Sequence, residues 1–277
     1  MTTVAAQTTE LHPLNRGFAW TPVRGPFRIS SDAQAQSFNE RGFFVLEDAI
    51  DASTIASVTA AIDPVEARGE EYLRAQPGRR MFIAEADGIT FTVHLVKRSQ
   101  VLREFSAGKV FADLCHDLIG PDVRLYWDQA VYKKPEYPKP FPWHQDNGYT
   151  YIEPQAYLTC WIALTDATLK NGCPWVIPGG HLRGTLKHWT TELGYVCRAD
   201  DGPEATPVPA RAGSIVVFSS LTPHRTGPNV TREVRKTYIL QYAPDGARVV
   251  ESGALCNAPD RQYVILRGGE RGVPTQI

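Results

Sequence analysis

The order of apolar and polar residues predicts helices early in the chain and strands after them. From residue 91 onward the sequence consists of short apolar or alternating runs, the clearest being 91–96, 213–218 and 231–242. Alternation places every second side chain on one buried face, which is typical of a strand. Glycine, proline and asparagine between the runs predict turns. Many short strands joined by turns favour a β-sandwich or barrel over parallel βαβ units.

Helices are predicted mainly before these strands. Residues 30–41 begin with Ser30-Ser31-Asp32, which can cap a helix that Gly42 then ends, and 43–46 read as a strand. A second helix is expected over 51–62, followed by a charged stretch of unassigned structure. A third is expected over 110–118. The fold class is therefore mainly β with flanking helices.

The length of 277 residues fits one large or two small domains, and a β-barrel or sandwich with added helices commonly reaches this size as one unit. No internal repeat or linker-like stretch divides the chain. We predict a single domain over residues 26–277. Residues 1–25, polar with scattered proline and glycine, are expected to form a loosely held, flexible N-terminal arm.

Charge excludes several partner classes. The formal net charge is −1, the pI is near 6.7, and the charged residues are dispersed, so neither a nucleic-acid nor a membrane surface is expected. The locally basic segment 133–140 is interpreted as a solvated loop. No signal peptide and no membrane-spanning apolar run are found, which favours a cytoplasmic location. Five cysteines without CxxC spacing are expected to be reduced and mostly buried.

A histidine and a carboxylate two residues apart provide the strongest chemical signal. On an extended strand, His144 and Asp146 point to the same side while Gln145 points away. His224, which follows the strand-like run 213–218, is the best third ligand. Two imidazoles and one carboxylate on one face of a metal are typical of non-haem Fe(II) oxygenases, whose open positions accept a co-substrate and O₂. Arg235 follows His224 by eleven residues in the alternating run 231–242.

Together these features resemble the phytanoyl-CoA dioxygenase family of Fe(II)- and 2-oxoglutarate-dependent oxygenases. The matches run from about position 35 to 243 in the family's order. They comprise the entry segment 38–46, His144-Gln145-Asp146, the run 161–168 with Asn171-Gly172-Cys173, the turn 176–181, and His224 with Arg235.

The resemblance implies a fold and a cofactor set. The core would be a double-stranded β-helix, the jelly roll of cupins, which the many short strands also favour. His144, Asp146 and His224 would hold Fe(II). Arg235 would pair with the distal carboxylate of 2-oxoglutarate through two parallel hydrogen bonds. The resemblance places four more residues near this co-substrate: Thr226, Trp161, Gln129 and His94.

Neighbouring cations and histidines are competing candidates. Arg232 and Lys236 are alternatives to Arg235, but strand alternation prevents Lys236 from facing the same side as Arg235, and the eleven-residue offset favours Arg235. His181 and His188 are assigned turn or substrate-side roles rather than metal ligation.

The expected activity is oxidation, by default hydroxylation, of an unactivated C–H bond of a small organic molecule, with release of succinate and CO₂. Family members that halogenate replace the carboxylate ligand with a small residue, so the presence of Asp146 favours hydroxylation. An aromatic cluster, Trp143, Tyr149, Tyr151 and Trp175, suggests a substrate with an apolar part. Residues 65–90 and 183–210 are expected to select the substrate, and the second of these could form a lid.

Two alternatives stay open: a cupin-like metalloenzyme that does not use 2-oxoglutarate, and a non-catalytic small-molecule binding protein on the same scaffold. Retention of three metal ligands and a costly arginine argues against the latter. The sequence predicts neither the substrate nor the oligomeric state.

Overall fold

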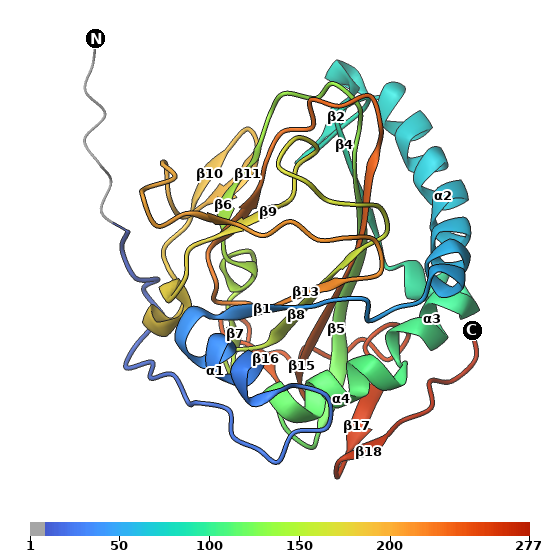
Figure 1. Cartoon of the computed structure of the whole chain (residues 1–277). Helices are drawn as coiled ribbons and strands as arrows, with labels where there is room; N and C mark the ends of the chain where they lie inside the picture. Colours follow the sequence, from blue (N-terminus) through green and yellow to red (C-terminus); the bar gives the residue numbers. More distant parts are fainter. Residues whose placement is uncertain (1–8) are drawn as a thin grey trace.

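Two antiparallel sheets face each other in the computed structural model, which describes residues 9–277 (Figure 1). The larger sheet has the order β1-β13-β8-β15-β5-β4-β3-β2, with β17 and β18 added beside β5, and the smaller sheet has the order β12-β9-β14-β6. Two facing antiparallel sheets of this kind form a cupin-like jelly roll. The predicted double-stranded β-helix is confirmed.

The strand bounds are as follows. The larger sheet contains β1 (Phe43–Leu46), β2 (Arg80–Met81), β3 (Ala84–Glu85), β4 (Ile89–Val93), β5 (Val123–Lys133), β8 (Leu158–Ala163), β13 (Ile215–Ser219), β15 (Arg235–Pro244), β17 (Val264–Arg267) and β18 (Glu270–Arg271). The smaller sheet contains β6 (Phe141–His144), β9 (Pro174–Val176), β12 (Thr206–Pro207) and β14 (His224–Thr226). Two short strand pairs are β7 (Ile152–Glu153) with β16 (Arg248–Val249), and β10 (Trp189–Thr191) with β11 (Gly194–Val196).

The helices are α1 (Asp32–Arg41), α2 (Ala52–Arg74), α3 (Gln100–Ser106) and α4 (Lys109–Leu118), with 3₁₀ turns η1 (Pro77–Arg79), η2 (Leu95–Lys97), η3 (Asp146–Gly148) and η4 (Gly180–Arg183). Helix α1 begins as predicted, because Ser31 and Gln34 form a reciprocal capping box. Gly42 ends it at φ 85°. A Cβ at this position would lie 2.5 Å from Thr222 Oγ1, so both conformation and space require glycine.

Helix α2 is longer than predicted. Asp51 caps its first turn as expected, but the helix continues past Pro64 to Arg74 instead of ending near Ile62. Beyond the proline, Val65 and Leu73 are still buried, and Glu66 accepts hydrogen bonds from the sheet and from the loop after β5. Tertiary packing therefore outweighs the local cost of proline within the helix.

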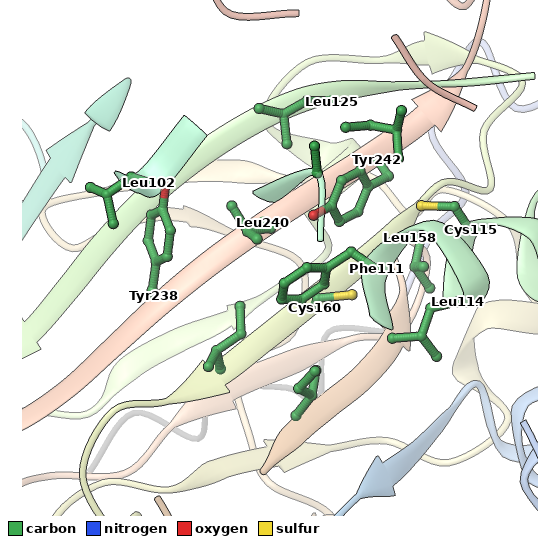
Figure 2. Close-up of a cluster of buried hydrophobic side chains, with 14 of the residues drawn as sticks. Leu102, Phe111, Leu114, Cys115, Leu125, Leu158, Cys160, Tyr238, Leu240 and Tyr242 are labelled. Carbon is green, nitrogen blue, oxygen red and sulfur yellow. The ribbon is translucent and has the colours of Figure 1, made fainter. Parts of the chain in front are cut away.

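Helices α2, α3 and α4 cover the outer face of the larger sheet (Figure 1). Figure 2 shows this layer, where Leu102, Phe111 and Leu114 from the helices meet Leu125, Cys160 and Leu240 from the strands. Burial of each large apolar side chain stabilises the fold by about 1.5–3 kcal/mol. Ala130 and Tyr132 on β5 belong to this outer core, so Gln129, Val131 and Lys133 point inward, toward the smaller sheet.

The interpretation of segment 133–140 as a solvated loop is wrong at its first residue. Lys133 is the last residue of β5 and is 0% exposed. The alternation of the strand carries its side chain to the inner face, whereas Lys134 reaches Glu66 on α2 on the other side. The exposed loop begins only after this pair.

Residues 1–8 of the predicted arm lie outside the described part of the chain. Within residues 9–25, the backbone of Glu10 and His12 hydrogen-bonds to Lys187 and Thr185, and Asn15 Nδ2 donates to two carbonyl oxygens. In the described residues 9–277, no helix combines the length and apolarity needed to cross a membrane. All five cysteines are free, and four of them are buried.

Candidate metal centre and its surroundings

Three polar side chains meet at one edge of the smaller sheet, between the two sheets. His144 ends β6 and pairs across the strands with His224, which begins β14. Nε2 of His144 lies 4.0 Å from Oδ1 of Asp146, and Nε2 of His224 lies 3.7 Å from the same oxygen. The three groups are close enough to ligate one metal ion.

The local backbone differs from the predicted strand. Strand β6 ends at His144, and Asp146 already begins the 3₁₀ turn η3. Gln145 between them remains extended, with φ −112° and ψ 145°. Its side chain points away into a buried hydrogen-bond network with Gly184, Leu186 and Leu221. The two ligands therefore converge as expected, although only the first lies on a strand.

Backbone carbonyls orient both imidazoles. Nδ1 of His144 lies 2.8 Å from the Pro142 oxygen, and Nδ1 of His224 lies 3.0 Å from the Thr222 oxygen. An Nδ1–H that donates to a carbonyl leaves Nε2 deprotonated and directed at the third ligand. This tautomer is the one a metal ion requires.

Two strands of the larger sheet hold the carboxylate. Thr159 on β8 donates its hydroxyl proton to Oδ2 of Asp146 at 2.5 Å, and Gln241 on β15 also hydrogen-bonds this group. Oδ1 is the oxygen that faces both histidines. The larger sheet thus orients the carboxylate so that one of its oxygens faces the candidate metal position.

Burial sets the charge state of the site. It lowers the pKa of His144 to about 3, with His224 as the next cause, and lowers the pKa of His224 to about 4. Burial also raises the pKa of Asp146, against the opposing effects of His144 and Thr159. Near pH 7 both imidazoles are neutral and available as ligands.

A buried arginine lies further along the inner face of the larger sheet. Arg235 is 0% exposed, and its guanidinium carbon is 5.4 Å from the centroid of the Trp161 ring. Nη1 donates to Thr237, while Nε and Nη2 have no hydrogen-bond partner in the described part of the chain. Burial lowers the Arg235 pKa to about 10, so the group remains a cation near pH 7.

The two alternative cations point elsewhere. Lys236 Nζ binds Asp63 of α2 at 2.8 Å on the outer face, and Arg232 is exposed. Strand alternation therefore places Arg235, and not Lys236, on the side of the candidate metal ligands, whereas Arg232 lies before the strand at the surface.

The other predicted co-substrate contacts lie along the same inner face. Trp161, Ile239 and Gln129 are aligned across β8, β15 and β5, and Gln129 accepts a hydrogen bond from Trp127. Thr226 lies two residues beyond His224 on β14. These positions share the inner face with the candidate metal ligands and Arg235, and their contacts with a co-substrate stay a prediction.

His94 does not lie on a strand as expected. Strand β4 ends at Val93, and His94 adopts a left-handed conformation with φ 56°. Its ring packs edge-on against Trp127 at 4.4 Å between centroids, and its Nδ1 has no partner. Burial, aided by Arg261, lowers its pKa to about 4.

The four aromatic residues expected around the metal segment do not form one wall. The Tyr149 ring packs edge-on against the rings of His144 and Tyr195, with 5.4 Å and 5.1 Å between the ring centroids. Trp143 and Trp175 instead flank the guanidinium of Arg225, and Tyr151 stacks on His12. Tyr149 is the member that borders the candidate centre.

His181 and His188 lie outside the three-residue group. His181 is buried beside α1, where Nε2 lies 3.1 Å from the Asn39 oxygen. His188 Nε2 accepts the backbone N–H of Gln145 at 2.9 Å. His188 thus supports the segment between two ligands without reaching the metal position itself.

Sequence reasoning missed Thr159, Gln241 and Lys133. Each lies an even number of residues from a predicted co-substrate contact on its own strand, namely Trp161, Arg235 and Gln129. The period-2 rule applied along those strands would have found them.

Thr159→Val is expected to weaken Fe(II) binding about 10- to 100-fold, because it removes the hydrogen bond that orients Asp146 while keeping the side-chain shape. Equilibrium dialysis with metal quantitation measures this. Thr92→Val is the matched control, because Thr92 pairs with Ala130 of the outer core. Equal iron affinity in both variants would contradict the assigned role of Thr159.

The metal-free protein is expected to lose stability as pH falls below about 6.5. Burial lowers the pKa of His144, His181, His188 and His224 to between about 3 and about 4, whereas an unfolded histidine titrates near 6.5. The unfolded state then binds more protons, so each such histidine costs about 1.4 kcal/mol per pH unit in this window.

The Asp128 carboxyl changes the unfolding free energy in the opposite direction, because burial raises its pKa to about 6. It therefore offsets the destabilisation caused by about one of these histidines. Urea unfolding in chelator at pH 7.5 and pH 5.5 measures the balance. Equal unfolding free energies at the two pH values would show that these histidines are not held neutral.

Three comparisons with known proteins agree with this geometry. The family model described as phytanoyl-CoA dioxygenase (PhyH) matches residues 38–237. Phytanoyl-CoA dioxygenase domain-containing protein 1 of Bos taurus is 26% identical, with 75% of this chain and 88% of the relative covered.

Two solved structures are similar in shape. The non-haem α-ketoglutarate-dependent carbocyclase SnoK from nogalamycin biosynthesis has a TM-score of 0.69 at 22% identity, covering 83% of this chain and 94% of that chain. EvdO2 from Micromonospora carbonacea var. aurantiaca, complexed with 2-oxoglutarate, has a TM-score of 0.63 at 27% identity, covering 78% and 91%.

Proposed function

Because the chain belongs to the phytanoyl-CoA dioxygenase (PhyH) family, we propose that His144, Asp146 and His224 hold the iron of a non-haem Fe(II)- and 2-oxoglutarate-dependent dioxygenase. The donor set supports this assignment, since two neutral imidazoles and one carboxylate converge on one point. Asp146 occupies the position of the carboxylate ligand, which favours hydroxylation of a C–H bond.

The buried Arg235 is the observation that carries the proposal. A guanidinium at 0% exposure with two unpaired nitrogens is costly unless an anion pairs with it. Among residues 9–277, no acidic side chain forms an ion pair with it. A carboxylate from a bound ligand would supply the missing partner through a bidentate pair.

The inner face suits a linear dicarboxylate with a chelating end. Its 2-oxo acid end would lie toward the metal ligands and its distal carboxylate toward Arg235, with Thr226, Trp161 and Gln129 along the way. His94, next to Trp127, is assigned the same neighbourhood.

When bound, Fe(II), 2-oxoglutarate and O₂ supply an oxidant able to attack an unactivated C–H bond, with release of succinate and CO₂. The chain's own residues position these reactants. Backbone carbonyls fix the tautomers of the two imidazoles, and Thr159 and Gln241 hold the Asp146 carboxylate. The ring centroid of Phe218 lies 4.6 Å from that of His224. This apolar neighbourhood limits water near the reacting atoms.

The substrate is a small molecule, and we assign it an apolar part. Tyr149, Tyr195 and Phe82 form a ladder of edge-on rings that starts at His144. Reduced cysteines support a cytoplasmic location.

Anaerobic titration with Fe(II) and 2-oxoglutarate tests the function. The expected result is a weak visible charge-transfer band of the chelate, followed by succinate release when O₂ is admitted. Bound iron without this band would reject the 2-oxoglutarate mechanism in favour of a cupin-like enzyme that binds substrate directly. Failure to bind either iron or 2-oxoglutarate would favour a non-catalytic binding protein.

A further inference from the structure

The two strands that carry the candidate histidine ligands pair irregularly beside those ligands. His144 on β6 lies opposite His224 on β14, but the register shifts before the next pair. As a result, Arg225 of β14 faces two residues of β6, Pro142 and Trp143. Such a bulge leaves one residue unpaired and disrupts the local ladder of hydrogen bonds. The smaller sheet is therefore weakly paired directly beside both histidines.

The two bulge residues of β6 use their carbonyl groups elsewhere. Pro142 has no N–H, and its carbonyl oxygen lies 2.8 Å from Nδ1 of His144. The Trp143 carbonyl accepts the backbone N–H of Cys197 at 2.9 Å. The main chain therefore contributes little to fixing the distance between β6 and β14 at this point.

One carboxylate joins the two sides of the bulge. Asp201 Oδ1 accepts the indole N–H of Trp143 at 2.9 Å, and Oδ2 accepts from Nη2 of Arg225 at 2.8 Å. Trp143 directly precedes His144 in the chain, and Arg225 directly follows His224. A single side chain thus links the immediate neighbours of both histidines.

The Arg225 guanidinium lies on the outer side of the smaller sheet. Strand alternation turns it away from His224, and its central carbon lies 5.4 Å and 4.8 Å from the ring centroids of Trp143 and Trp175. The side chains of Arg225 and Asp201 are 12% and 56% exposed, so solvent screens their ion pair only in part.

The loop that carries Asp201 has contacts of its own. Arg198 Nε donates to the Asp200 carbonyl oxygen at 2.7 Å, and Arg198 Nη1 binds Glu204. The hydrogen bond from Cys197 to Trp143 fixes the start of the same loop to β6. The position of Asp201 is therefore supported by its own segment as well as by the two residues that it binds.

From this arrangement we propose that Asp201 is a positioning residue for the metal centre. It locks β6 to β14 across the bulge and so maintains the spacing of His144 and His224, whose ring centroids lie 4.1 Å apart. Asp201 acts through Trp143 and Arg225, its two hydrogen-bond donors. The inference rests on the proposed function and adds to it a residue on the opposite side of the sheet.

Asp201→Asn tests the assignment, because asparagine keeps the shape of the side chain and removes the charge that pairs with Arg225. We expect this variant to raise the Kd of Fe(II), measured by anaerobic equilibrium dialysis, about 3- to 10-fold. The effect is smaller than for a residue that touches a ligand, because Asp201 is more than half exposed.

Asp200→Asn is the matched control. It removes the same charge from the adjacent residue, whose Oδ1 lies 3.0 Å from Nε of Arg198. The Kd of Fe(II) in this variant should equal that of the wild type. Equal Kd values in Asp201→Asn and the wild type overturn the proposal.

The visible spectrum of bound Co(II) separates positioning from a general loss of stability. The intensity of its d–d bands depends on the geometry of the ligands, so at saturation the bands should change in Asp201→Asn and stay unchanged in Asp200→Asn. A lower free energy of unfolding of metal-free Asp201→Asn, with wild-type Kd and wild-type bands, overturns the proposal. If the wild type binds neither metal, the proposed function is rejected and this inference falls with it.

Arg225→Met tests the route by which Asp201 acts. Methionine keeps an apolar chain between Trp143 and Trp175 and removes the guanidinium. In this background Asp201→Asn should raise the Kd of Fe(II) less than about twofold further, because the ion pair is already absent. An undiminished effect of Asp201→Asn in the Arg225→Met protein overturns the proposed link between the two strands.

Discussion

Arg235→Gln is expected to weaken 2-oxoglutarate binding by about two to three orders of magnitude. Truncating one member of a buried, hydrogen-bonded charge pair costs about 2–5 kcal/mol, and each 1.4 kcal/mol is about tenfold in Kd. Arg235 is 0% exposed, and two of its nitrogens have no hydrogen-bond partner among residues 9–277, so solvent does not screen its interaction with a bound carboxylate. Anaerobic titration of the chelate band gives the two Kd values.

Lys236→Gln is the control for that experiment. This substitution also removes one positive charge, from the residue next to Arg235. In the wild type, however, Lys236 Nζ binds Asp63 on the outer face. The Kd of Lys236→Gln for 2-oxoglutarate should match that of the wild type. If Arg235→Gln also binds 2-oxoglutarate normally, the distal carboxylate lies elsewhere and the orientation proposed along β15 is wrong.

Asp146→Asn is expected to have the largest effect on the metal. It removes the charged ligand while preserving the shape of the side chain, and an amide oxygen is a weaker donor to Fe(II) than a carboxylate oxygen. The loss of iron affinity should exceed the 10- to 100-fold expected for its partner Thr159. Turnover, measured as succinate released, should fall with it.

Asp128→Asn provides a matched buried carboxylate. Asp128 also lies on the larger sheet, is 1% exposed, and hydrogen-bonds Tyr238 of the outer core. This variant should bind iron as the wild type does. Normal iron content and succinate release in Asp146→Asn would remove Asp146 from the ligand set.

Local sequence signals are sufficient where one short segment decides the structure. The capping box of Ser31 and Gln34 fixes the start of α1, and Gly42 fixes its end. Alternation along 231–242 alone separates Arg235 from Lys236, because strand side chains alternate with a period of two. For the same reason the convergence of His144 and Asp146 is predictable, since it needs only one extended residue between them.

Elements that depend on distant partners are less predictable. Helix α2 extends through Pro64 because its later residues pack on β4 and the loop after β5. The sequence pattern predicts a strand at His94, yet β4 ends one residue earlier. Neither outcome can be obtained from a local pattern, because the deciding contacts join residues far apart in the chain.

By itself the sequence predicted the fold class, which the structure confirms, and it proposed three candidate metal ligands and Arg235 as the cation for a co-substrate, since each rests on residue type, short-range periodicity and the family resemblance. Only the tertiary structure decided which side chains complete the site. Thr159 and Gln241 reach Asp146, and Lys133 reaches Thr226, because three strands distant in sequence lie in one register. A lysine at the start of a basic segment appeared exposed in the sequence, and only the pairing of β5 with β15 places it beside Arg235.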